Sequence, residues 1–85
     1  MNVFYSKKFD KMFLKCPQEI RDKFIERLGL FKENKYDSTL NNHTLSGKLK
    51  GSRSINVSGD YRVIFKEKPD GILLTTIGTH SQLYK

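Results

Sequence analysis

The residues between His43 and Tyr84 include the types that internal RNA cleavage requires. Such cleavage needs a base that takes the proton from the 2′-hydroxyl, cations that stabilise the charged transition state, and an acid that protonates the leaving 5′-oxygen. Histidine suits either proton-transfer role because its unperturbed pKa is about 6.5. Arginine supplies electrostatic stabilisation, and tyrosine can stack on a base. The candidate catalytic residues are His43, Asp60, Arg62, His80 and Tyr84.

Each candidate also has a purely structural interpretation, which the sequence leaves open. His80 follows an apolar run and can cap the end of a strand, and Asp60 can cap the turn at Ser58–Gly59. Arg62 can form an ion pair with Asp60, two residues away. His43 can be a solvated or capping histidine of a loop, and Tyr84 can be a loose terminal aromatic. The catalytic interpretation therefore depends on these residues sharing one surface.

Motifs for other kinds of chemistry are missing from the sequence. There is no CxxC, HExxH or histidine cluster for zinc, and no G-x-S-x-G elbow. Gly47 and Gly51 bracket Lys48-Leu49-Lys50, but no Gly-Lys-Ser/Thr follows as in a P-loop. We therefore expect phosphodiester chemistry without a metal ion and without a cofactor.

The charge balance favours a polyanionic partner. The formal net charge is +7 over 85 residues, which points first to nucleic acid, although lysine-rich surfaces also keep proteins soluble. Lys48, Lys50 and Arg53 are grouped where turns and strands can hold them on a rigid face. We expect these three residues to bind RNA through backbone phosphates, without reading sequence.

Length and cysteine content indicate a small cytoplasmic domain. We expect residues 1–85 to form a single domain. Cys16 is the only cysteine, so no intramolecular disulfide is possible and a reducing cytosol is natural. No apolar run approaches the ~20 residues that span a membrane, and the N-terminus lacks the apolar core of a signal peptide.

The first half of the chain predicts a short strand followed by two helices. Residues 2–5 suit an edge strand. Phe9, Met12 and Phe13 have helical spacing, and Cys16-Pro17 ends that helix. A second apolar stripe predicts another helix, with Ile25 widening the stripe and close packing expected around Gly29. That stripe consists of Ile20, Phe24, Leu28 and Phe31.

The second half predicts strands at 53–57, 60–66 and 72–77, separated by turns at Ser58–Gly59 and 69–71. Ile55 and Val57 share one face of the first of these strands. A polar loop precedes them, with Leu40 and Leu45 expected to anchor it to the core. The predicted fold class is α+β, with an N-terminal strand and a helical hairpin packed on a small antiparallel sheet.

Two short motifs stand out in the second half: G-D-Y-R at Gly59–Arg62 and G-T-H-x-x-L-Y at Gly78–Tyr84. In this order and spacing they resemble the RelE/ParE superfamily of type II toxin–antitoxin toxins, most closely its YafQ-like mRNA interferases. The N-terminal stretch YSKKFDKMFLKCP is similar as well, so the resemblance covers nearly the whole chain. It implies a toxin that cuts mRNA on the ribosome without metal and is inhibited by a cognate antitoxin protein.

The resemblance also implies roles for individual residues. His43, Asp60, His80 and Tyr84 match the loop histidine, aspartate, C-terminal histidine and terminal aromatic of the YafQ-like branch, and Arg62 matches the strand arginine that RelE-type members use at the scissile phosphate. Asn56 stands where that branch has a further histidine, and asparagine cannot transfer protons. Two alternatives remain: a ParE-like inhibitor of DNA gyrase, and a non-catalytic, partner-binding member of the same fold.

Overall fold

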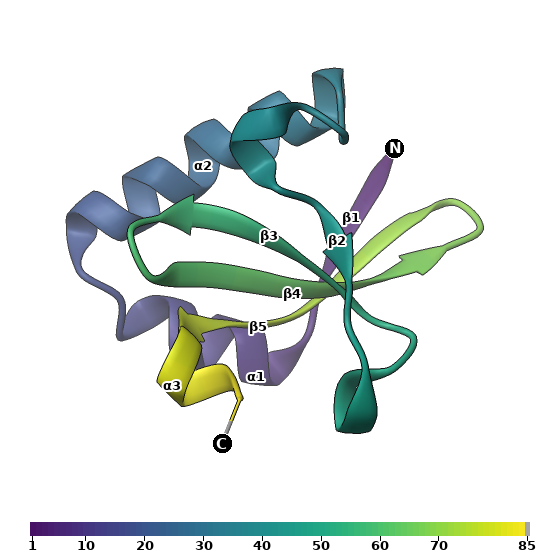
Figure 1. The fold of residues 1–85 in the computed structure, drawn as a ribbon. Helices are drawn as coiled ribbons and strands as arrows, with labels where there is room; N and C mark the ends of the chain where they lie inside the picture. Colours follow the sequence, from purple (N-terminus) through teal and green to yellow (C-terminus); the bar gives the residue numbers. More distant parts are fainter. Residues whose placement is uncertain (85) are drawn as a thin grey trace.

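A five-stranded sheet with two helices on one face forms the framework of the molecule (Figure 1). The computed structural model describes residues 1–84. Among these residues, no helix is long and apolar enough to cross a membrane. The elements, of which η1 and η2 are short 3-10 helices, are β1 (Asn2–Tyr5), α1 (Lys7–Leu14), α2 (Gln18–Glu33), η1 (Ser38–Leu40), β2 (His43–Thr44), η2 (Gly47–Leu49), β3 (Arg53–Ser58), β4 (Tyr61–Lys68), β5 (Gly71–Thr79) and α3 (His80–Leu83).

The sheet is mixed, with strand order β1-β5-β4-β3-β2. Strands β3, β4 and β5 are antiparallel, as expected; β2, which was predicted as loop, pairs antiparallel to β3, and β1 pairs parallel to β5. The helical segment between β1 and the other strands allows this, because parallel pairing requires a long connection. Gly71 makes the pairing possible, since a Cβ at this position would collide with the backbone of Asn2.

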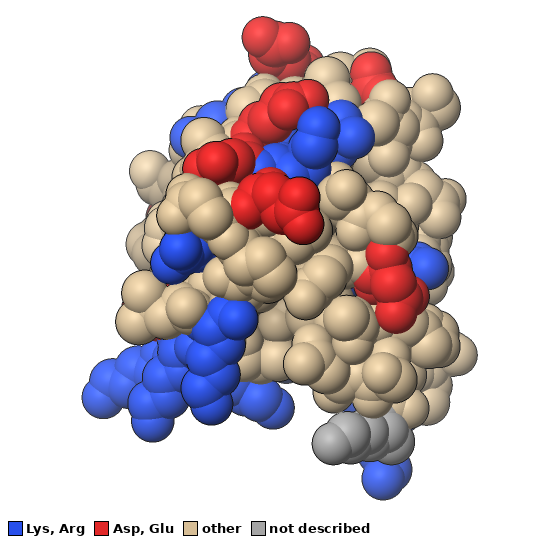
Figure 2. Space-filling view, turned by 90° about the vertical axis from the view of Figure 1, so that its left-hand side faces the viewer, with Lys and Arg blue, Asp and Glu red and all other residues tan. Residues whose placement is uncertain are grey.

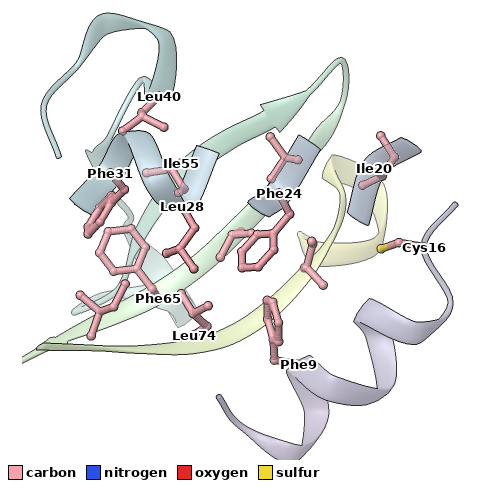
Figure 3. Close-up of a cluster of buried hydrophobic side chains, with 14 residues drawn as sticks. Phe9, Cys16, Ile20, Phe24, Leu28, Phe31, Leu40, Ile55, Phe65 and Leu74 are labelled. Atoms are coloured by element: carbon pink, nitrogen blue, oxygen red, sulfur yellow. The ribbon is translucent and has the colours of Figure 1, made fainter. Parts of the chain in front are cut away.

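The two expected helices form as a hairpin. Ser6 is the N-cap of α1, where its Oγ accepts a hydrogen bond of 2.9 Å from the backbone N–H of Phe9. Pro17 lies directly before α2 and separates it from α1. The amphipathic spacing of both helices turns their aromatic side chains toward the sheet, where they pack against strand residues such as Phe65 and Leu74 (Figure 3).

Two expectations for α2 were wrong. Ile25 is 62 % exposed and so does not widen the buried stripe. Gly29 is exposed, and a Cβ built there would meet nothing within 4 Å. Both residues lie beyond the edge of the stripe because each residue of a helix is rotated by ~100° from the last. Close packing within this chain therefore does not explain Gly29.

The other face of the sheet carries neither α1 nor α2 and is turned to the viewer in Figure 1; it is called the open face below, although Ser54 and Ile64 on it are buried. Alternation along β3 directs Ile55 and Val57 into the core beneath the sheet and Ser54 and Asn56 to the open face. In β4, Arg62 lies opposite Asn56 and thus on the same open face. In Figure 1, α3 lies at the lower left of this face and η2 at the lower right.

Candidate active site

Arg62 lies near the start of the central strand β4 and is held on the open face by Asn56. The two residues are direct cross-strand partners in β4 and β3, and Arg62 Nη1 donates a hydrogen bond of 3.2 Å to Asn56 Oδ1. Within residues 1–84, no carboxylate forms an ion pair with Arg62, so the ion pair with Asp60 that the sequence allowed does not form. Arg62 Nε is buried without a hydrogen-bond partner among these residues. The guanidinium therefore keeps its full charge and retains N–H donors for a ligand.

Asp60 connects the β3–β4 turn to α3 at one rim of the open face. The turn needs Gly59, whose φ of +55° is unfavourable for residues with a Cβ. Asp60 Oδ2 then accepts a hydrogen bond of 3.3 Å from the backbone N–H of His80. A carboxylate at this point also complements the partial positive charge of the first turn of a helix. Asp60 thus holds the backbone that carries His80 rather than its imidazole ring.

Residues His80–Leu83 form a short helix, α3, that was not predicted from the sequence. A capping box starts α3: Thr79 Oγ1 accepts from the backbone N–H of Gln82 at 3.4 Å, and Gln82 Oε1 accepts from that of Thr79 at 2.8 Å. The Thr-x-x-Gln spacing was the available signal. Gly78 leaves room for the return of the chain, since a Cβ there would lie 2.6 Å from Gln82 Oε1.

His80 and Tyr84 are brought together by this helix. Their ring centroids are 4.5 Å apart with an interplanar angle of 47°. The spacing of four residues places both side chains on one face of the turn. The backbone N–H of Tyr84 also donates to the carbonyl of His80 at 3.0 Å. Tyr84 is therefore a packing partner of His80, and His80 itself is exposed.

His43 lies on the opposite side of the open face from His80. It belongs to β2, where it pairs with Ser54 of β3. His43 Nδ1 is 2.8 Å from the carbonyl oxygen of Asn41. Because a carbonyl only accepts, Nδ1 carries the proton and Nε2 holds the lone pair of the neutral ring. Two inter-strand spacings of ~4.8 Å separate β2 from β4, and Arg62 lies two residues further along β4, because Ser54 pairs with Ile64.

Ser54 was not predicted as a site residue, yet it lies between His43 and the strand of Arg62. Its side chain faces the open side of the sheet, because it pairs with His43 on one side and Ile64 on the other. Ser54 is fully buried, and its Oγ has no hydrogen-bond partner among the described residues. Period-2 alternation with Ile55 and Val57 was the signal that placed it on this face.

The three predicted RNA-binding residues do not share one surface. Lys48 and Lys50 are exposed on η2 and directly after it, beside the open face (Figure 1). Arg53 shares its strand parity with Ile55, so it points to the face that carries the helices. There, Arg53 Nε donates a hydrogen bond of 2.8 Å to Asn42 Oδ1. The expectation that Arg53 shares one rigid face with Lys48 and Lys50 was therefore wrong.

Cys16 lines a hollow of about 240 Å³ that lies away from the open face, beside α1 and α3. Burial raises the pKa of the Cys16 thiol, and the nearby Arg21 guanidinium opposes this effect. A neutral thiol is a poor nucleophile, so Cys16 has the character of a packing residue. Within residues 1–84, no group of three or more His, Cys, Asp or Glu side chains is arranged to hold a metal ion.

Solved structures with the same fold include YafQ and chains of toxin–antitoxin complexes. The crystal structure of E. coli YafQ matches with a TM-score of 0.81 and 24% identity, covering 99% of this chain and 98% of that chain. A chain of the E. coli DinJ–YafQ toxin–antitoxin complex matches with a TM-score of 0.77 and 25% identity, covering 99% of this chain and 97% of that chain. A chain of the RelB–RelE antitoxin–toxin complex from Methanococcus jannaschii matches with a TM-score of 0.77 and 19% identity, covering 98% of this chain and 96% of that chain. The α+β fold is therefore that of the RelE-like toxins.

The sequence assigns the chain to one family of proteins with this fold. The model of the YafQ family, described as bacterial toxins of type II toxin-antitoxin systems, matches residues 1–85. The chain belongs to this family, and the resemblance noted in the sequence is confirmed. A comparison with curated protein sequences gives no match.

Proposed function

We propose that this toxin is a ribosome-associated mRNA endonuclease, an mRNA interferase that inhibits translation. The observation that supports this most directly is the charged Arg62 on an open sheet face, with His43 on one side and His80 on the other. A face with this shape and charge suits a single RNA strand laid across the sheet. The cleaved phosphate would lie against the guanidinium.

The proposed reaction is an internal transesterification. His43 Nε2 takes the proton from the 2′-hydroxyl, and the O2′–P bond forms. The P–O5′ bond then breaks, and His80 gives its proton to the leaving 5′-oxygen. The products are a 2′,3′-cyclic phosphate and a 5′-hydroxyl. Arg62 stabilises the extra negative charge on the phosphoryl oxygens between these steps.

Asp60 and Tyr84 support the acid rather than replace it. Asp60 fixes the first residue of α3 through the backbone of His80. Tyr84 packs against the imidazole and offers a ring on which a nucleobase can stack. Lys48 and Lys50 bind the RNA backbone beside the face, whereas Arg53, which points to the opposite face and is bonded to Asn42, does not contact this strand. The scheme needs neither a metal ion nor a cofactor, since side chains supply every proton and charge.

The proposed partners are mRNA, ribosomal RNA and a cognate antitoxin protein. Ribosomes place the activity in the cytoplasm, and residues 1–85 act as one toxin domain. Support for an antitoxin comes from the similar toxins crystallised with DinJ and RelB. A gyrase inhibitor of the ParE type would have the same fold but would not need proton-transfer groups on the open face.

A translation assay with purified ribosomes, run beside a gyrase supercoiling assay, tests the proposal. The wild-type toxin should cut ribosome-bound mRNA and leave supercoiling unchanged. His80→Ala should lower cleavage at least ~100-fold, the usual contribution of a general acid, while its circular dichroism spectrum stays that of the wild type. Gyrase inhibition without mRNA cleavage would replace this function with the ParE-like one. The absence of both activities would identify a non-catalytic member.

A further inference from the structure

A hollow of about 240 Å³ lies next to α3, between this helix, the end of α1 and the helix-bearing face of β4 and β5. Most of its lining residues are uncharged, none is acidic, and Lys15 is the only charged one. A cavity of ~150 Å³ already holds a benzene ring. The hollow therefore has room for one heteroaromatic ring. The lining residues are Met12, Lys15, Cys16, Tyr61, Ile77 and Gln82.

The walls of the hollow are set by the fold of the chain. Cys16 and Ile77 belong to the buried core, and Tyr61 packs against that core. Gln82 is fixed by the capping box of α3, because its Oε1 accepts a hydrogen bond of 2.8 Å from the backbone N–H of Thr79. A preformed site loses little side-chain freedom when it binds a ligand. A flat ring can therefore enter without reorganising the walls.

Three lining residues present polar groups that the chain itself does not use. Within residues 1–84, the Lys15 ammonium, the Tyr61 hydroxyl and the Gln82 amide nitrogen have no hydrogen-bond or ion-pair partner. All three groups can donate hydrogen bonds, and the ring of Tyr61 adds a surface for stacking. Proteins hold unstacked RNA bases with this combination of an aromatic ring, side-chain donors and a cation.

The surface beside the hollow is basic toward α1. Figure 2 views the molecule from the side of the β3–β4 turn and shows Lys and Arg side chains grouped at the lower left, on the side of α1. Lys11 and Lys15 are four residues apart and so lie on the same side of this helical segment. Neither forms an ion pair within residues 1–84. Lys15 can therefore hold the phosphate of a nucleotide whose base enters the hollow.

The hollow lies on the other side of α3 from the proposed acid. Gln82 follows His80 by two residues, a rotation of ~200°, whereas Tyr84 returns to the side of His80. The helix is a single turn, only ~6 Å long. β1 pairs with residues 71–74 of β5, so within residues 1–84 no strand flanks the outer edge of β5 from there to α3. An RNA strand that leaves the open face beside His80 therefore reaches the hollow by passing one helical turn.

We infer that the hollow is a subsite for the base of the nucleotide directly downstream of the cleaved bond. The inference rests on the proposed mRNA endonuclease. In that reaction His80 protonates the leaving 5′-oxygen, which belongs to the downstream nucleotide, so this nucleotide lies nearest to α3. Its base stacks on Tyr61 and accepts a hydrogen bond from the Gln82 amide, while Lys15 holds the phosphate on its 3′ side. An apolar side chain of a protein partner fits less well, because it would leave these donors unpaired.

Removal of the base from the substrate tests the subsite directly. Ribosomes are programmed with two mRNAs that differ only in the nucleotide directly downstream of the mapped cleavage position. This nucleotide carries its base in one mRNA and is abasic in the other. The wild-type toxin should cut the abasic mRNA with a kcat/KM about 10-fold lower, because stacking on an aromatic side chain is lost. Steady-state cleavage measures both values.

Tyr61→Leu removes the ring and keeps an apolar side chain against the core. It should lower kcat/KM for the normal mRNA about 10-fold but leave that for the abasic mRNA unchanged, because without a base the ring has no partner. A merely structural role of Tyr61 would lower both values alike. Tyr36→Leu changes an exposed tyrosine outside the hollow and should match the wild type on both mRNAs.

Lys15→Ala gives a second readout at an exposed position, where folding does not depend on the side chain. It should raise KM for the normal mRNA several-fold and leave kcat unchanged, because a phosphate contact away from the cleaved bond is equally strong in the ground state and the transition state. Lys32→Ala removes an exposed lysine of α2 outside the hollow and should leave KM unchanged.

Three results would overturn the subsite and leave the endonuclease intact. The first is equal cleavage of the two mRNAs by the wild type. The second is an equal loss on both mRNAs in Tyr61→Leu together with a wild-type KM in Lys15→Ala. The third is wild-type cleavage by both variants with weakened binding of the purified antitoxin, which would assign the hollow to a protein partner. A wild-type toxin that cuts neither mRNA would instead refute the endonuclease, and this subsite with it.

Discussion

Asn56 and Arg62 face each other across β3 and β4, and the amide oxygen of Asn56 accepts a hydrogen bond of 3.2 Å from the guanidinium. Asparagine at this position cannot serve as a proton-transfer group. Its amide oxygen can orient the guanidinium without neutralising its charge, whereas a carboxylate would neutralise that charge. The geometry therefore gives Asn56 a positioning role toward Arg62 and concentrates proton transfer in His43 and His80.

Two substitutions of Asn56 should distinguish the effect of orienting the Arg62 guanidinium from the effect of its charge. Asn56→Ala frees the guanidinium, so kcat for mRNA cleavage should fall ~10-fold while KM changes little, because the cation remains. Asn56→Asp keeps the acceptor but pairs with Arg62, so the attraction for phosphate falls and KM should rise several-fold. Steady-state kinetics on ribosome-bound mRNA measures both constants. Wild-type kcat in Asn56→Ala would remove the positioning role.

The capping box of α3 should matter more for activity than for stability. Thr79→Ala removes the acceptor for the backbone N–H of Gln82, which costs ~1 kcal/mol. Because α3 is a single turn that carries His80 and Tyr84, its fraying should disperse their ring contact and lower cleavage about 10-fold. Thr79→Ser keeps a hydroxyl and should restore activity. Denaturant titrations measure the unfolding free energy of both variants, and cleavage assays measure their activity. An equal loss of cleavage activity in Thr79→Ala and Thr79→Ser would contradict the prediction.

Cys16 should make stability depend on pH in the alkaline range. Burial raises the pKa of its thiol above the ordinary 9.0. The folded state therefore holds the proton more tightly than the unfolded state. The stabilisation is full below pH 9.0 and is lost as pH rises from there through the higher folded pKa. Since lysines and tyrosines also titrate there, the test is the difference in unfolding free energy between wild type and Cys16→Ala. A difference that stays constant from pH 8 to 11 would contradict the prediction.

The parts of the fold that depend on local patterns could be predicted, and those that depend on tertiary pairing could not. The apolar stripe from Ile20 to Phe31 and the alternation around Ile55 gave the helices and strands correctly. The parallel pairing of β1 was missed because four residues carry no information about their partner strand. The exposure of Ile25 was missed because the edge of a helical stripe is set by the neighbouring element.

Two features of the site could have been predicted from the sequence but were not. Arg53 has the same strand parity as Ile55 and Val57, so its position on the helix-bearing face followed from the predicted strand itself. Thr79 and Gln82 have the spacing of a capping box, which predicts a helix where a tail was expected. The contact of Asp60 with the backbone of His80, by contrast, joins residues 20 apart through a turn and no sequence pattern specifies it.

Arg53 points to the helix-bearing face of the sheet, and η2 lies beside the open face. Substitutions at the two places should therefore change the salt dependence of RNA affinity differently. Each lysine that contacts RNA phosphate releases about one counterion, so Lys48→Ala and Lys50→Ala should each reduce the slope of log affinity against log salt by ~0.7–0.9. Arg53 is turned away from the open face and bonded to Asn42, so Arg53→Ala should leave the slope within ~0.2 of the wild type and lower stability instead, through the lost side-chain bond. Binding of a non-cleavable 2′-O-methyl oligonucleotide, measured from 50 to 300 mM KCl, gives the slopes. A slope change for Arg53→Ala equal to that of the two lysine variants would mean that RNA wraps around the β2 edge of the sheet and contacts both of its faces.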